Sequence, residues 1–291
     1  MNDRHQIIHA NGIEFAYFTC GEGPLALCLH GYPDTAHTWR YLMEPLANAG
    51  FRAVAPFMRG YAPTQLDAHH RYQSGVLGLD ANALHTAFGA DEQAVLIGHD
   101  WGALGAYCAA SLEPHRWRRV VTIAVPPGPV TASAFFAYEQ LKMSWYMFFQ
   151  LNALADMVIA MDEFAFIQRL WQDWSPHYDS HEDVSNFAVS MATPDNVTAA
   201  LSYYRQTLVG ELADPALSEA QSATLALPPQ PLLYLHGTND GCMGIATARA
   251  TNELLSEPSR YVEVDAAGHF LHLEQPDVVN RHIINFVTAA D

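Results

Sequence analysis

The segment AVLIGHDWGALGAYCAAS, residues 94–111, joins an apolar run, a sharp turn and a run of small residues in direct succession. This order predicts a β-strand, a tight turn and an α-helix. The turn reads Gly98-x-Asp100-x-Gly102, a spacing typical of a strained elbow that exposes its central side chain. Serine is usual at the centre of such an elbow, whereas this chain has an aspartate. The segment constrains the chain to a fold in which strands and helices alternate.

Short apolar runs alternate with helical patterns over much of the chain. Asn11-Gly12 is a strong hairpin signal within residues 6–19. The further strands that we expect cover 25–29, 52–56, 94–97, 120–125, 232–235 and 261–264. The expected helices cover 40–49, 73–89 and 278–289. The alternation predicts a mostly parallel central sheet with helices on both faces.

The alternation is interrupted between residues 128 and 227. This stretch is rich in aromatic residues and helical patterning, and it contains no convincing strand. Its helix breakers are Pro176, Pro194 and Pro215. We therefore expect an all-helical insertion. The predicted domains are a core formed by residues 1–127 and 228–291 and a helical cap formed by residues 128–227.

The charge of the chain narrows its possible partners. The 291 residues carry 14 basic and 31 acidic side chains, which gives a formal net charge of −17. Such an acidic surface repels nucleic acid and anionic lipid, so we expect neither a nucleic-acid nor a membrane partner. The most apolar stretch, 143–161, is interrupted by polar residues and is typical of a buried helix rather than a membrane span. The first residues lack the pattern of a secretory signal, and we expect a cytoplasmic protein.

The four cysteines are scattered along the chain without the spacing of a disulfide framework or a metal site. They are Cys20, Cys28, Cys108 and Cys242. Cys28 and Cys108 lie inside apolar segments, which is typical of small core residues. We therefore expect no bound metal.

Three polar residues each follow a predicted strand. Asp100 follows the strand at 94–97, Asp240 lies in GTNDG after 232–235, and His269 lies in AGHF after 261–264. Sites in open parallel sheets form at the carboxyl ends of the strands, so the three side chains are expected to converge. Each alone is ordinary, because aspartate is common in turns and the chain has 15 histidines. Together, in the order nucleophile, acid and histidine, they predict a catalytic set.

Other residues compete for two of these roles. His272 lies three residues beyond His269 but lacks the preceding glycine that lets the loop turn toward the site. A second position for the acid exists after the strand at 120–125. That strand ends in Val125-Pro126-Pro127 without a carboxylate, which favours Asp240 as the partner of His269.

Several segments resemble the epoxide hydrolases of the α/β-hydrolase fold. In the predicted core they are HGYPDTAHTW (30–39), APFMRGYAPT (55–64), GHDWGA (98–103), GTNDG (237–241) and AGHF (267–270). In the predicted cap they are SWYMFFQL (144–151), LWQDWSP (170–176) and LSYYRQ (201–206). The resemblance extends over nearly the whole chain and implies an α/β-hydrolase fold with a helical cap. The chain departs from the family at Phe57, where aspartate is frequent, and in a shorter SWY-to-FQ spacing.

A carboxylate at the centre of the elbow suits substitution at saturated carbon. Serine would form an ether there that water does not cleave, whereas Asp100 forms an ester whose carbonyl belongs to the enzyme. His269, oriented by Asp240, then activates water against that ester. The resemblance implies an oxyanion hole formed by the backbone N–H groups of Tyr32 and Trp101.

The leaving group separates two reactions at saturated carbon. An epoxide oxygen leaves as an alkoxide and needs a proton donor, for which a phenol is suited. Tyr146 and Tyr204 stand at the positions that the resemblance assigns to such donors. A halide needs only weak donors, and Trp101 suits it. Dehalogenase relatives generally carry asparagine where this chain has Tyr32, which favours the epoxide.

The sequence therefore predicts a hydrolase that converts a small hydrophobic epoxide and water to a vicinal diol, with no cofactor. A haloalkane or haloacid dehalogenase with the same nucleophile is the first alternative. A non-catalytic binding scaffold of the same fold is the second, and the intact set of Asp100, Asp240 and His269 argues against it. The sequence favours neither a monomer nor a homodimer.

Overall fold

The computed structural model describes residues 4–290 and contains one eight-stranded sheet. The strands are β1 (Gln6–Ala10), β2 (Ile13–Cys20), β3 (Leu25–Leu29), β4 (Arg52–Pro56), β5 (Val95–His99), β6 (Arg119–Ile123), β7 (Leu232–Gly237) and β8 (Arg260–Val264). Their order across the sheet is β1-β2-β4-β3-β5-β6-β7-β8. Strands β3 to β8 pair in parallel, while β1 and β2 form the expected hairpin and pair antiparallel at one edge.

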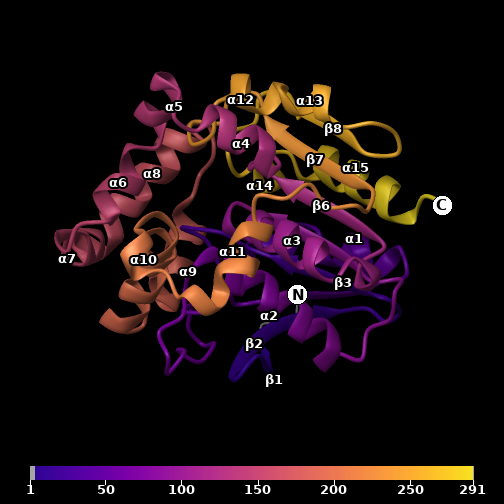
Figure 1. Cartoon of the computed structure of the whole chain (residues 1–291), viewed down its shortest axis with the longest axis horizontal. Coiled ribbons are helices and arrows are strands. Elements are labelled where there is room, and N and C mark those ends of the chain that lie inside the picture. The colour runs from indigo at the N-terminus through magenta and orange to yellow at the C-terminus, as the bar shows by residue number, and fades with distance from the viewer. Residues whose placement is uncertain (1–3, 291) are drawn as a thin grey trace.

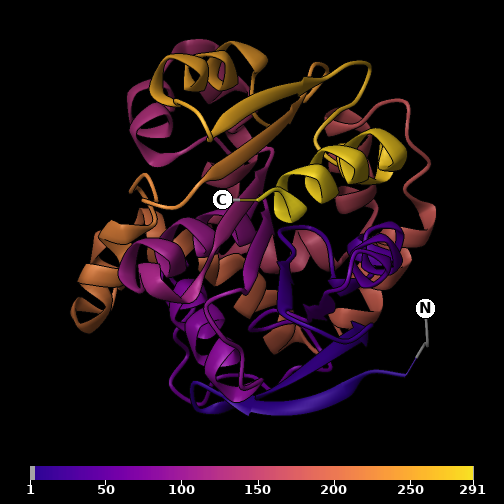
Figure 2. The same ribbon diagram turned by 90° about the vertical axis from the view of Figure 1, so that its right-hand side faces the viewer.

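Helices cover both faces of the sheet. The α-helices are α1 (Met43–Asn48), α2 (Ser74–Ala87), α3 (Trp101–Leu112), α4 (Gly128–Ala134), α5 (Tyr138–Met143), α6 (Trp145–Gln150), α7 (Leu154–Ala160), α8 (Ala165–Trp174), α9 (His181–Ser190), α10 (Pro194–Leu208), α11 (Ser218–Ala223), α12 (Ile245–Arg249), α13 (Thr251–Leu254), α14 (Leu271–Glu274) and α15 (Pro276–Thr288). The 3₁₀ helices are η1 (Ala36–Tyr41), η2 (Pro114–Arg116), η3 (Asp162–Phe164), η4 (Gly210–Leu212) and η5 (Pro215–Leu217). Helices α1 and α15 lie on one face, and α2 and α3 on the other (Figure 2).

The central strands are buried on both faces. Every residue of β3, β5, β6 and β7 is buried, as the continuous apolar runs LALCL and VLIGH predict. The edge strand β8 is only partly buried and has a mixed composition. The fold class predicted from the sequence, a mostly parallel sheet flanked by helices, is confirmed.

The boundaries of several elements differ from the expected ones by a few residues. The largest difference is at the expected helix 40–49. It begins earlier as η1, is interrupted at Leu42 and continues as α1. Thr35 explains the early start, because its side-chain oxygen accepts a hydrogen bond from the N–H of His37 at the amino end of η1. A polar cap of this kind allows a helix to begin several residues before the periodic pattern of apolar residues begins in the sequence.

The described structure between residues 128 and 227 contains helices and no strand. Helices α6, α7, α8 and α10 lie together at one side of the sheet, on the left in Figure 1. Helix α11, however, contacts α2 and α3 of the sheet layer. The division into a cap at 128–227 and a core stays a prediction. Within residues 4–290, no helix has the length and apolar character that crossing a membrane requires.

Polar contacts hold these helices against loops at the carboxyl ends of the strands. Arg40 in η1 forms a salt bridge with Asp183 in α9 at 2.7 Å. The Tyr203 hydroxyl donates to the carbonyl oxygen of Arg59 at 2.6 Å, and the Trp171 indole donates to that of Pro33 at 3.0 Å. The helical segment is thereby fixed over the edge of the sheet where the predicted site residues lie.

Gly102, at the start of α3, lies in a gap too small for a side chain. A Cβ atom there would lie 2.2 Å from the carbonyl oxygen of Leu29, the last residue of β3. The absence of a side chain therefore lets helix α3 begin directly against the end of β3, which brings the elbow to the loop that follows β3.

We predict that Gly102→Ala lowers the free energy of unfolding by about 1–3 kcal/mol, because the backbone of β3 has to shift. This loss exceeds the gain of about 1 kcal/mol that alanine brings to a helix. Gly210→Ala is the matched control, since a Cβ there meets no atom within 4 Å, and we expect a change within about 0.5 kcal/mol. Chemical denaturation of both variants measures the difference, and equal stabilities would contradict the prediction.

Candidate active site

Asp100 occupies the turn between β5 and α3 in a backbone conformation that is rare for a residue with a side chain. Its φ angle is +52° and its ψ angle is −119°. Such strain is tolerated only where the surroundings fix it, and it is frequent at functional sites. Here the N–H of Asp100 donates to the carbonyl oxygen of Ile123 at 3.2 Å. The strained elbow predicted from the sequence is therefore present, and it directs the Asp100 side chain into a cavity at the carboxyl end of β5.

The loop after β3 supplies a backbone donor to this carboxylate. The N–H of Tyr32 donates to Oδ1 of Asp100 at 2.8 Å. A Cβ atom at Gly31 would lie 2.3 Å from the Cβ of Asp100, so this close approach needs glycine. The Tyr32 side chain is turned away, since its hydroxyl accepts a hydrogen bond from Gln150 at 2.9 Å. Among residues 4–290, no hydrogen bond joins the N–H of Trp101 to Asp100.

His269 lies between the two aspartates that the sequence predicts as its partners. Its Nδ1 atom is 3.0 Å from Oδ2 of Asp240, and its Nε2 atom is 3.5 Å from Oδ2 of Asp100. The second carboxylate oxygen of Asp240 accepts the N–H groups of Cys242 at 2.7 Å and Met243 at 2.9 Å. The structure thus brings Asp100, Asp240 and His269 together, with both of the side chains facing His269 fixed in position.

A backbone carbonyl from the helical segment connects the loop that carries Asp240 with the loop that carries His269. The carbonyl oxygen of Trp174, the last residue of α8, accepts the N–H of His269 at 3.0 Å and the N–H of Gly241 at 3.2 Å. A Cβ atom at Gly268 would lie 2.4 Å from the same oxygen. The glycine that precedes the histidine in the AGHF motif is therefore required by this contact.

His272, the competing histidine, does not reach the elbow. Its Nε2 atom is hydrogen-bonded to the Thr38 hydroxyl at 2.6 Å. The ring of His99 lies between the two histidines, with its centroid 4.8 Å from that of His269 and 4.6 Å from that of His272. The geometry therefore favours His269 over His272 as the partner of Asp100.

The charged groups shift one another's pKa values. Burial opposes ionisation of Asp100, but the hydrogen bond and charge of His269 outweigh it, so the pKa of Asp100 is lowered. Burial likewise opposes ionisation of Asp240, and His269 again lowers its pKa. Burial opposes protonation of His269, but Cys242, Asp240 and Asp100 together raise its pKa well above the ordinary value. Both carboxylates are therefore ionised at neutral pH.

Two tyrosines from the helical segment face the elbow. Tyr146 and Tyr204 line the same cavity as Asp100, and their ring centroids are 5.9 Å apart. The Tyr204 hydroxyl is buried without a hydrogen-bond partner among the described residues. Burial raises the pKa of both phenols well above the ordinary value, so both stay protonated at neutral pH.

Their sequence neighbours point elsewhere. The hydroxyl of Tyr203 is bound to the backbone of Arg59, and Trp145 is 47% exposed. Of each adjacent pair of aromatic residues, the structure therefore directs Tyr146 and Tyr204 to the cavity. The shorter SWY-to-FQ spacing does not change this orientation.

The cavity at Asp100 has a volume of about 470 Å³. Its lining is mostly apolar and includes Trp101, Leu104, Val125, Phe135, Met147, Leu208, Leu225 and Met243. The indole Nε1 atom of Trp101 is buried without a hydrogen-bond partner among the described residues. A cavity of this size and composition suits a small apolar molecule that has few polar atoms.

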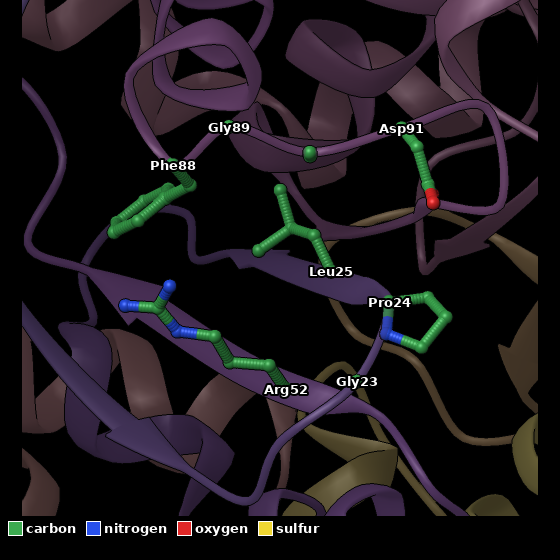
Figure 3. Close-up of a pocket in the computed structure, with 8 residues that line it drawn as sticks. Gly23, Pro24, Leu25, Arg52, Phe88, Gly89 and Asp91 are labelled. Atoms are coloured by element: carbon green, nitrogen blue, oxygen red, sulfur yellow. The ribbon is translucent and has the colours of Figure 1, made fainter.

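A second cavity, of about 280 Å³, lies at the opposite ends of the strands. It is bounded by the first residues of β3 and β4, Leu25 and Arg52, and by the loop after α2 (Figure 3). The guanidinium carbon of Arg52 lies 4.9 Å from the ring centroid of Phe88. Its lining residues include no histidine, cysteine or hydroxyl group, so the reactive groups belong to the cavity at Asp100.

Sequence reasoning missed two residues of the site. Cys242 lies beside the reacting groups, with its sulfur 3.3 Å from the Tyr146 hydroxyl. Trp174 holds the two loops through a backbone atom, and its ring lies 5.2 Å from that of His269. Neither residue has a sequence signal of its own, because a scattered cysteine and a backbone carbonyl leave no pattern.

Comparisons with known proteins agree with this geometry. Residues 24–276 match the family described as alpha/beta hydrolase fold. An epoxide hydrolase of Caballeronia sordidicola is 30% identical over 98% of this chain and 93% of its own length. The AB hydrolase superfamily protein YfhM of Bacillus subtilis (strain 168) is 29% identical over 97% of each chain.

A solved structure has the same fold. The epoxide hydrolase of Bacillus megaterium in complex with an inhibitor superposes with a TM-score of 0.81 at 24% identity, over 98% of this chain and all of that one. The chain therefore belongs to the alpha/beta hydrolase fold family and, within it, to the epoxide hydrolases, which confirms the family and the enzyme class predicted from the sequence.

Proposed function

We propose that this protein hydrolyses a small, neutral, hydrophobic epoxide to a vicinal diol through an ester on Asp100. One observation carries the proposal: Asp100, Tyr146 and Tyr204 line a single apolar cavity. The cavity therefore presents both a nucleophile for a carbon of the epoxide ring and proton donors for the oxygen of that ring. The helices within 128–227 act in this proposal as a cap that supplies the two donors.

In the first step, Oδ2 of Asp100 attacks an epoxide carbon, and the C–O bond of the ring breaks. Oδ1 stays on the N–H of Tyr32, which lies 2.8 Å away. The departing oxygen takes a proton or a strong hydrogen bond from Tyr204 and Tyr146. The unpartnered hydroxyl of Tyr204 supports this role, because no internal hydrogen bond has to be broken.

In the second step, His269 removes a proton from water, which attacks Cγ of the Asp100 ester. Negative charge develops on Oδ1, where the N–H of Tyr32 stabilises it; a donor of this kind is worth about 3 kcal/mol. The N–H of Trp101 is proposed as the second donor. Asp240 holds the Nδ1 atom of His269 and stabilises the imidazolium that forms. The bond between Cγ and Oδ2 then breaks, and the departing diol oxygen takes the proton from His269. The remaining proton of the water returns to the tyrosine, and Asp100 is again a carboxylate.

A second candidate is dehalogenation by the same nucleophile. The buried and unpartnered indole N–H of Trp101 favours it, because such a donor suits a departing halide. Tyr32 argues against it, since its side chain is bound to Gln150 and does not line the cavity. The protons that the two tyrosines can supply are also unnecessary for a halide.

A panel of three substrates tests the proposal. We expect the protein to convert an aryl epoxide to its diol and to release no halide from a chloroalkane or a haloacid. Product detection by chromatography and by halide assay measures both. Halide release without diol formation would establish the dehalogenase, and turnover of none of the three would favour a binding scaffold.

For His269→Gln we predict accumulation of the ester, because the first step keeps its nucleophile while the second loses its base. Intact-protein mass spectrometry should show an adduct equal to the whole mass of the epoxide. A haloalkane ester would instead weigh the substrate less hydrogen halide. His272→Gln is the matched control and should not accumulate the adduct. Turnover of His269→Gln at the wild-type rate would place the base elsewhere.

For Tyr204→Phe we predict a fall of about 10²-fold in the rate of ester formation, in the range of a lost proton donor. Tyr203→Phe is the matched control, since that hydroxyl is bound to the backbone of Arg59. It should lose about 1 kcal/mol of stability and keep its rate. Rapid-quench measurement of a single turnover separates the two variants. A larger loss in Tyr203→Phe than in Tyr204→Phe would refute the assignment.

A further inference from the structure

Cys242 is a buried thiol beside the reacting groups that the proposed reaction does not use. It lines the same cavity as Asp100. One potential ligand atom each of Asp100, Cys242 and His269 lie within 4.8 Å of one another, and all three residues are buried. A carboxylate oxygen, a thiolate sulfur and an imidazole nitrogen are the ligand types that Zn²⁺ takes in proteins.

The spacing of these atoms is close to that of a tetrahedral ion. Zinc bonds of ~2.0–2.3 Å separate neighbouring ligand atoms by roughly 3.3–3.8 Å. The Nε2 atom of His269 and Oδ2 of Asp100 are 3.5 Å apart. Two of the three ligand positions therefore need no rearrangement, and a rotation of the short Cys242 side chain about its Cα–Cβ bond adjusts the third.

His269 provides an observation that is independent of the cysteine. Its Nε2 atom is buried and its contact with Oδ2 of Asp100 is long, at 3.5 Å, while its Nδ1 atom is 3.0 Å from Asp240. Metal-binding histidines are usually oriented in this way, with one nitrogen held by a carboxylate and the other directed to the ion. Asp240 therefore serves a metal-bound His269 as well as a catalytic one.

The main chain at Cys242 is held on both sides of the residue. Its N–H donates to Asp240 at 2.7 Å, and its carbonyl oxygen accepts from the Gln140 side chain at 3.0 Å. The sulfur is therefore presented to the cavity by a fixed backbone. On coordination the thiol proton passes to solvent, so that thiolate and carboxylate together neutralise the two charges of the ion.

We propose that Asp100, Cys242 and His269 form an inhibitory site for a thiophilic divalent cation such as Zn²⁺. The ion enters through the cavity, and water from the cavity completes its coordination. The inhibitory effect rests on the proposed function, because the ion occupies the atoms that attack the epoxide and activate water. Binding of the ion does not depend on that function.

Cobalt binding to the full-length protein tests the site without an activity assay. Titration with Co²⁺ should produce a thiolate-to-metal charge-transfer band that saturates at one equivalent. Cys242→Ala and Cys242→Ser should lack the band, whereas Cys20→Ser, which alters a partly buried thiol on β2, should keep it. Absence of the band from the wild-type protein, or its persistence in Cys242→Ala, would overturn the proposal.

Zinc inhibition of epoxide hydrolysis tests the effect. The Zn²⁺ concentration for half-inhibition should rise about 100-fold or more in Cys242→Ala relative to the wild type, each compared with its own metal-free rate. A chelator should restore the wild-type rate, and Cys20→Ser should respond as the wild type does. Equal zinc sensitivity in Cys242→Ala would overturn the proposal. A cobalt band in a protein that hydrolyses no epoxide would instead refute the proposed function and leave the site standing.

Discussion

The left-handed backbone of Asp100 is the constraint on which the rest of the site depends. A non-glycine residue in such a conformation costs about 1–3 kcal/mol and persists only where its surroundings over-determine it. Here β5 lies between β3 and β6, the residue's own N–H is bound to β6, and Gly31 and Gly102 let the loop and helix on either side approach without a side chain. The carboxylate is therefore placed by the sheet, and the remaining groups are arranged around a fixed point.

The electrostatics of the site change as the proposed reaction proceeds. The hydrogen-bonding interaction with the Asp100 carboxylate is one of the causes that raise the pKa of His269, and an ester on Asp100 removes that carboxylate. We therefore expect the pKa of His269 to fall at the stage when, in the proposed reaction, the imidazole accepts a proton from water. Asp240, held by two backbone N–H groups, keeps its charge throughout and orients the ring. In the proposed reaction the two aspartates differ in role because only one of them becomes neutral.

The sequence was sufficient for features that depend on local pattern. Alternating apolar runs and helices predicted the parallel sheet, and the ends of strands predicted that Asp100, Asp240 and His269 would converge, because parallel strands share one carboxyl edge. Contacts made by backbone atoms of distant segments left no such pattern. The Trp174 carbonyl that joins the acid and histidine loops is invisible in a sequence, as is the contact of α11 with α2 and α3. The inward orientation of Tyr146 and Tyr204 was predicted only through family resemblance, since neighbouring tyrosine and tryptophan residues fit the same periodicity.

The proposed metal site follows from the same preorganisation that suits the proposed reaction. The proposed ester hydrolysis needs an imidazole that a carboxylate orients through one nitrogen and whose other nitrogen faces the ester on a second carboxylate. That description also fits two ligands of a metal ion, and a third soft ligand nearby is enough to complete a site. In this chain the loop that fixes Asp240 also carries Cys242, because the N–H of Cys242 is one of the donors to Asp240. A residue without sulfur at position 242 would preserve that backbone contact and remove the third ligand, so the thiol is separable from the positioning of the acid.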